Sequence, residues 1–214
     1  MFAFVEVIRL SPHRPAGADQ PDQAGGSEKV GLLAGVARVG HDLADAGRYV
    51  RADVRLATVI GLVAVHCSFT MAFDALLPTL SERVGGSSGL YGSILIGLGA
   101  GALVGTIGVS QLGEGPGRGR AFWATGTGSG AAMLVLGWAP NPTVVVIGGV
   151  LAGLTQASYM TLSATLIQRV VADKFRGRVM SLYIMIAAGH MAFMNLGFGW
   201  VADHADVRAL LIGP

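Results

Sequence analysis

The chain has 214 residues, of which 52% are hydrophobic and 13% are charged, and its formal net charge is +2 at pH 7. So much apolar sequence exceeds what the core of a soluble domain requires, which predicts a protein of the lipid bilayer. The basic residues are scattered outside the apolar stretches, which argues against a nucleic-acid partner, and the single cysteine, Cys67, excludes a disulfide framework and a multi-cysteine metal site.

The N-terminal quarter of the chain shows three patterns in succession. Residues 1–10 are apolar with two charged interruptions, as at the end of a preceding transmembrane helix. Residues 11–30 are rich in Pro, Gly, Ala, Asp and Gln, which predicts a flexible cytoplasmic linker. Within 31–54 the apolar residues recur every three or four positions, which predicts an amphipathic helix on the membrane surface.

From residue 55 to 214 the sequence predicts a C-terminal bundle of transmembrane helices. A helix needs about 20 mostly apolar residues to cross the hydrocarbon core, and continuous apolar stretches favour helices over the alternating strands of a barrel. The predicted spans lie at about 56–80, 90–112, 121–139, 143–168 and 179–202, with the start of a further span at 209–214. We therefore expect an all-α membrane protein of five complete transmembrane helices and partial flanking helices, truncated at both ends.

The distribution of Lys and Arg predicts the orientation of these spans. Thirteen of them precede the first span or lie between the second and third or the fourth and fifth spans, whereas the opposite side has only Arg83 and Arg208. Cytoplasmic connections carry the excess of basic residues. We therefore expect a multi-pass protein of the cell membrane (inner or plasma membrane) with its N-terminal segment in the cytoplasm.

Small residues recur along three of the predicted spans. Close backbone approach at such residues lets helices associate in lipid, so each stripe is expected to be a helix contact. The stripes are Gly97, Gly101 and Gly105 in the second span, Gly126 and Gly130 in the third, and Gly149, Gly153 and Ala157 in the fourth.

Several motifs resemble the major facilitator superfamily of transporters. Residues 173–182 (DKFRGRVMSL) resemble its cytoplasmic connection between the tenth and eleventh helices, and residues 199–203 (GWVAD) resemble the end of the eleventh. Residues 31–35 and 47–50 are similar to the surface helix between its two halves. Within the superfamily, the chain resembles exporters of the enterobactin-efflux and macrolide-efflux type.

The resemblance covers essentially the whole chain and implies the C-terminal half of a major facilitator fold. It implies an antiporter, without a cofactor, that expels a small amphipathic molecule such as a drug or siderophore at the expense of a proton gradient. The substrate would lie between this half and the missing N-terminal half of the same transporter, and the two halves would rock around it. A truncated remnant that does not transport is an alternative.

Asp74 is the only acid well inside an apolar stretch. A carboxylate at the bilayer centre costs about 2.5–3.5 kcal/mol on insertion scales, so such a residue is expected to be functional. Desolvation favours its protonated form, which would let Asp74 bind substrate or exchange protons during transport.

Uncharged polar side chains inside the spans are further candidates for the substrate or proton pathway. Gln156 and Tyr159 belong to the fourth span, and His190 and Asn195 to the fifth. They are expected to line a central cavity, although the same groups also bridge neighbouring helices. His66 and His190 lie near the middle of their spans and are expected to be buried, with an interhelical hydrogen bond as the simpler role.

The segment that carries the strongest resemblance also predicts a cytoplasmic gate formed by Asp173, Arg176, Gly177 and Arg178. Its arginines would pair with acids or helix ends and lock one conformation. Anchoring of the cytoplasmic side by positive charge is the alternative interpretation.

An intramembrane enzyme is the main competing function. Residues 86–89 (GSSG) have the form G-x-S-G of rhomboid-type serine proteases, with His190 as the conceivable base. These serines fall in an outer connection, whereas His190 lies at mid-depth of its span, so a hydrogen bond between them is difficult. The sequence therefore favours a transporter over an enzyme.

Overall fold

The computed structural model describes residues 27–85, 88–113, 115 and 117–202. The chain divides into two units, Met1–Gly40 and His41–Pro214, and the second contains the bundle. The elements are α1 (Ser27–Ala52), α2 (Val54–His66), η2 (Cys67–Met71), η3 (Ala72–Leu76), α3 (Leu77–Arg83), α4 (Ser88–Ser110), α5 (Gly117–Gly137), α6 (Pro142–Val170) and α7 (Asp173–Ala202). The predicted helix end at 1–10, most of the linker at 11–30 and the span start at 209–214 lie outside the described residues.

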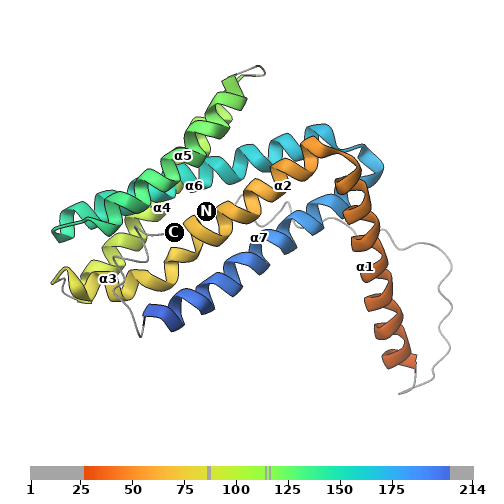
Figure 1. Cartoon of the computed structure of the whole chain (residues 1–214), viewed down its shortest axis with the longest axis horizontal. Coiled ribbons are helices and arrows are strands. Elements are labelled where there is room, and N and C mark those ends of the chain that lie inside the picture. The colour runs from red at the N-terminus through yellow and green to blue at the C-terminus, as the bar shows by residue number, and fades with distance from the viewer. Residues whose placement is uncertain (1–26, 86–87, 114, 116, 203–214) are drawn as a thin grey trace, which may run out of the picture. The chain divides into compact units, whose positions relative to one another are not determined.

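Four stretches of helix in the described residues are long and apolar enough to cross a membrane, which confirms the all-α membrane fold. They are Val54–Met71, Gly89–Ser110, Pro142–Val170 and Asp173–Trp200. The predicted third span forms α5, which has 21 residues and packs along α6 (Figure 1). Helix α5 is not among the four, because Gly, Thr and Ser residues in its middle and two arginines in its first turn lower its mean hydropathy. Its crossing of the membrane stays a prediction.

The predicted first span is not one regular helix, and it does not continue the helix before it. Asp53 separates α1 from α2, because its carboxylate accepts hydrogen bonds from the backbone N–H groups of Arg55 (2.9 Å) and Leu56 (3.3 Å) and caps α2. The helix predicted at 31–54 therefore ends at Ala52. Its first residue is Ser27, which lies inside the predicted linker.

Beyond His66 the first span widens into the π-helix η2 and then tightens into the 3₁₀-helix η3 before α3 begins. Pro78 stands in the first turn of α3, where it lacks an N–H and its ring conflicts with the carbonyl four residues earlier. The hydroxyls of Ser68 and Thr70 donate to the carbonyls of Ala64 (2.8 Å) and His66 (2.6 Å), a bond that bends helices. Pro78 thus gives the irregularity a local cause at the end next to α3.

Helix α6 is the centre of the bundle, since it contacts α2, α4, α5 and α7. Its closest neighbour is α4, and glycine makes that approach possible. A Cβ at Gly101 would overlap the carbonyl oxygen of Val150, one at Gly105 that of Leu154, and one at Gly153 that of Leu98. The glycine stripes predicted on the second and fourth spans are therefore helix contacts.

The predicted stripe on the third span is a contact at only one of its two glycines. A Cβ at Gly126 would lie 3.1 Å from the Tyr159 ring, whereas at Gly130 it would meet nothing within 4 Å. On the other side of α6, α7 packs beside α2, η2 and η3 (Figure 1).

Alanine at Gly101 should weaken the bundle. Its methyl group would meet backbone that cannot move aside, and overpacking of this kind costs about 1–3 kcal/mol in the free energy of unfolding. The matched control is Gly99→Ala, two residues away in the same helix, where a Cβ meets nothing within 4 Å. Thermal unfolding of the detergent-solubilised variants measures both. A midpoint for Gly101→Ala equal to that of Gly99→Ala would contradict the packing.

Candidate functional site

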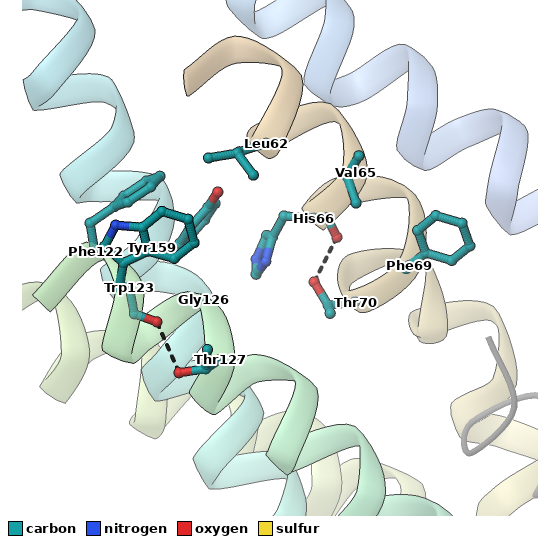
Figure 2. A pocket seen from close by; sticks show the side chains of 10 residues that line it. All are labelled: Leu62, Val65, His66, Phe69, Thr70, Phe122, Trp123, Gly126, Thr127 and Tyr159. Carbon is teal, nitrogen blue, oxygen red and sulfur yellow. Dashed lines mark hydrogen bonds between the residues drawn. The ribbon is translucent and has the colours of Figure 1, made fainter. Parts of the chain in front are cut away.

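A pocket of about 220 Å³ opens between the first span, α5 and α6 (Figure 2). The first span contributes side chains from α2 and η2, so the pocket lies where the regular helix ends. Its wall is mostly apolar and aromatic. The lining residues are Leu62, Val65, His66, Phe69, Thr70, Phe122, Trp123, Gly126, Thr127 and Tyr159.

Three stacked rings form the floor of this pocket. The Tyr159 ring lies between those of His66 and Phe122, with centroid distances of 4.1 Å and 4.6 Å and interplanar angles of 28° and 23°. Gly126 leaves room for the tyrosine ring on the side of α5. His66 and Tyr159 are 6% and 4% exposed, whereas Trp123 is 63% exposed, so a buried aromatic floor is joined to an open apolar rim.

His66 brings an unsatisfied polar atom into this apolar setting. Its Nε2 is buried and has no hydrogen-bond partner in the part of the chain that the structure describes. A buried polar group without a partner costs about 1–3 kcal/mol, so a hydrogen bond from a group that reached Nε2 would be favourable. The prediction that His66 is buried is therefore confirmed, but a partner on another helix is missing among the described residues.

Gln156 ties α6 to the irregular part of the first span. Its side chain is buried, and its Nε2 donates a hydrogen bond of 2.8 Å to the backbone carbonyl of Thr70, inside η2. Single π-helical turns occur frequently at functional sites. Gln156 and Tyr159, two of the predicted pathway residues, are thus brought together one turn apart, and both face the end of α2 and η2.

Of the predicted pathway residues whose side chains are described, only Tyr159 lines this pocket. The expected burial of His190 is wrong: its side chain is exposed on α7, and its Nδ1 lies 2.9 Å from the carbonyl oxygen of Ile186 in the same helix. Asn195 is half-buried on α7, and its Oδ1 is buried without a partner in the described residues. Asp74 lies in η3, and its side chain is outside the described part of the structure.

The sequence favoured a structural role for His66 and gave no sign of its stack with Tyr159. One available signal is Thr70, one turn after His66, in a span that Pro78 already marks for a break. The stack itself could not be foreseen, because Tyr159 and Phe122 come from two other helices.

The predicted cytoplasmic gate is not a connection but the first turns of α7, which begins at Asp173. Asp173 suits a helix N-terminus, where a negative charge is stabilised by the helix dipole. It pairs with Arg176 in its own turn, at 2.5 Å. Gly177 has open space around it.

Arg178 makes the long-range ion pairs of this segment. Its guanidinium lies 3.1 Å from a carboxylate oxygen of Asp42 and 3.7 Å from one of Asp45, both on α1. Asp45 also accepts from Arg48 and lies 3.5 Å from His41 Nδ1. The Arg48 hydrogen bond lowers the pKa of Asp45, and the charges of His41, Arg48 and Arg178 lower it further, so Asp45 is ionised at neutral pH.

Few residues of the competing enzyme site can be placed. Gly86 and Ser87 are outside the described residues, as is the side chain of Ser88. Among the described side chains, no group of three His, Cys, Asp or Glu is suited to hold a metal ion.

Comparison with known proteins gives one match. The family described as transmembrane secretion effector matches residues 34–214. No curated protein and no solved structure matches the chain. The family match covers most of the sequence, and four helical stretches among the described residues are long and apolar enough to cross a membrane. The chain therefore belongs to the transmembrane secretion effector family of the major facilitator superfamily, and it is a multi-pass membrane transporter.

Proposed function

We propose that this transporter exports a small amphipathic molecule, such as a drug or siderophore, in exchange for protons. The pocket at the break in the first span is the observation that carries the proposal. Its apolar and aromatic wall suits the apolar part of such a molecule, and the Nε2 of His66 suits a single polar group. The motifs that resemble enterobactin-efflux and macrolide-efflux exporters support the same substrate class.

The size of the pocket suits part of a substrate rather than the whole. Pockets for drug-sized ligands measure about 300–1,000 Å³, and this one measures about 220 Å³. A flat ring of the substrate would lie against the exposed ring of Trp123 at the rim, and the remainder would extend toward an N-terminal half of the transporter. Transporters of this type bind substrate near the bilayer midplane between their halves.

The irregular helix offers a way to couple binding to movement. Binding sites in transporters are typically formed by discontinuous helices near the midplane, and here η2 and η3 separate α2 from α3. The Gln156 hydrogen bond to the Thr70 carbonyl holds this segment against α6. A substrate that binds His66, one turn before Thr70, would act directly on the segment that must bend.

Asp74 is our candidate for the proton-carrying group. It lies in η3, a few residues beyond the pocket along the same span. An acid in an apolar segment favours its protonated form when water leaves and its ionised form when water returns. Alternate exposure to the two sides of the membrane would therefore bind and release one proton in each cycle.

The thirteen basic residues on one side support a cell-membrane protein whose N-terminal segment is cytoplasmic. In that orientation the Arg178 cluster would lie at the cytoplasmic ends of α6 and α7.

A cysteine introduced at residue 174 should then be labelled by an impermeant maleimide only after cells are opened, and one at residue 140 in intact cells. The reverse pattern would contradict the orientation.

An efflux assay tests the function. The full-length product of the gene is expressed in cells that lack their main efflux pumps, and retention of fluorescent amphiphiles and of siderophores is measured. Lower retention that a protonophore abolishes is the expected result. Unchanged retention of every compound would contradict export, and lower retention that survives the protonophore would contradict proton coupling.

Phenylalanine at position 66 should weaken substrate binding. His66→Phe keeps a ring against Tyr159 but removes Nε2, so it isolates the hydrogen bond from the stack. A neutral hydrogen bond contributes about 0.5–1.5 kcal/mol, so KM for export is expected to rise about two- to tenfold. The control Thr58→Ala removes an exposed hydroxyl of α2 outside the pocket. Equal KM values for the two variants would exclude His66 from binding.

Removal of the Asp74 charge should uncouple export from pH. Asp74→Asn keeps the shape of the side chain but cannot exchange a proton, so the initial export rate is expected to lose its dependence on the pH difference across the membrane. Glu82→Gln is the matched control, since Glu82 is an exposed acid near the end of α3, just beyond the same span. If Asp74→Asn retains the wild-type pH dependence, Asp74 is not the coupling group.

A further inference from the structure

We propose that residues 41–52, the end of α1, form a strap that moves together with the turn between α6 and α7 as one rigid body, and that Arg178 is the residue that aligns it. The proposal rests on the proposed function in one respect, namely that this body belongs to the half that rocks during transport. Three kinds of contact carry it, and each joins α1 to this turn or to the adjoining ends of α6 and α7.

Apolar burial is the first contact. Ala46 is 0% exposed and Val50 is 7% exposed, which is unusual for a helix lying free on a membrane surface. They belong to the same core as Ile167, Val171 and Val179, at the end of α6 and the start of α7. The apolar stripe of α1 is therefore packed against protein along its last two turns.

An aromatic pair is the second contact. Tyr49 of α1 stacks on Phe175 of α7 with a centroid distance of 4.5 Å and an angle of 24°. The Tyr49 hydroxyl oxygen also accepts a hydrogen bond of 3.3 Å from the backbone N–H of Ala172, between α6 and α7. Lys174 Nζ lies 5.2 Å from the centroid of the Phe175 ring. Tyr49 thus contacts both the Phe175 ring and the backbone of the turn between α6 and α7.

Ion pairs are the third contact, and they fix the position of α1 along the start of α7. Asp42 and Asp45 lie one turn apart on α1, and the Arg178 guanidinium reaches both. Arg48 holds Asp45 in place by a hydrogen bond from the next turn of α1. Arg176, only two residues away from Arg178, pairs instead with Asp173 on α7. The ion pairs of Arg178 therefore join two helices, whereas the ion pair of Arg176 stays within α7.

The position of the strap in the chain has a mechanical consequence. Asp53 directly follows α1 and caps α2, so the strap is joined by one residue to the start of the first span. The strap is thereby attached both to the start of the first span and to the α6–α7 turn. Movement of the chain segment before the strap would be transmitted to both together.

Proteolysis of the full-length protein in lipid nanodiscs tests the attachment without any transport. Trypsin cleavage after Arg51, an exposed residue of the strap, is followed with time. Arg178→Gln should speed this cleavage about two- to fivefold, as expected for the loss of a partly exposed ion pair. Arg176→Gln should leave the rate unchanged. Equal rates for Arg178→Gln and Arg176→Gln would overturn the role of Arg178.

A cross-link tests whether the strap and the turn move as one body. In a Cys67→Ser background, Tyr49→Cys and Phe175→Cys are joined by a disulfide or a short bifunctional reagent, and export is measured before and after reduction. Unchanged export in the cross-linked protein is the expected result. Export that is blocked and returns on reduction would show that the strap must detach, which overturns the proposal. If the unmodified protein exports nothing, the proposed function fails while the trypsin result still decides the attachment.

Discussion

Close contact between the backbones of α4 and α6 is the constraint on which the rest of the bundle depends. Lipid tails are as apolar as the side chains, so helices in a membrane gain little by hiding apolar surface from lipid and associate through tight packing. Gly101, Gly105 and Gly153 bring the two backbones so near that no Cβ would fit. With one face of α6 held in this way, its other faces carry Gln156 and Tyr159 to the first span.

The pocket follows from the mismatch between a straight α6 and an irregular first span. The backbone from Cys67 to Leu76 leaves α-helical geometry, and Gln156 binds it through the Thr70 carbonyl. His66, the last residue of the regular helix, stacks on Tyr159 but keeps an unsatisfied nitrogen. The irregular backbone and an unsatisfied buried nitrogen thus lie next to each other in the first span.

Fully charged groups are arranged differently from these uncharged ones. The ion pairs formed by Asp42, Asp45, Asp173, Arg176 and Arg178 lie at the end of α1 and the first turns of α7. Charge is expensive in the hydrocarbon region, and these ion pairs lie outside the middle of the spans, where they align helices. Inside the bundle, neutral groups such as Gln156 perform the same task with single hydrogen bonds.

The sequence alone predicted the membrane character, the helical class, the approximate places of α4, α6 and α7, and most of the glycine contacts. These could be predicted because hydropathy and the spacing of small residues are properties of short segments. The tertiary structure decided where the first span breaks, that His190 is exposed, that His66 stacks on Tyr159, and that Arg178 rather than Arg176 reaches α1. Those features join residues far apart in the chain, such as Gln156 with Thr70 and Arg178 with Asp42. No spacing within one helix encodes which face meets which neighbour, since that depends on how all the helices pack together.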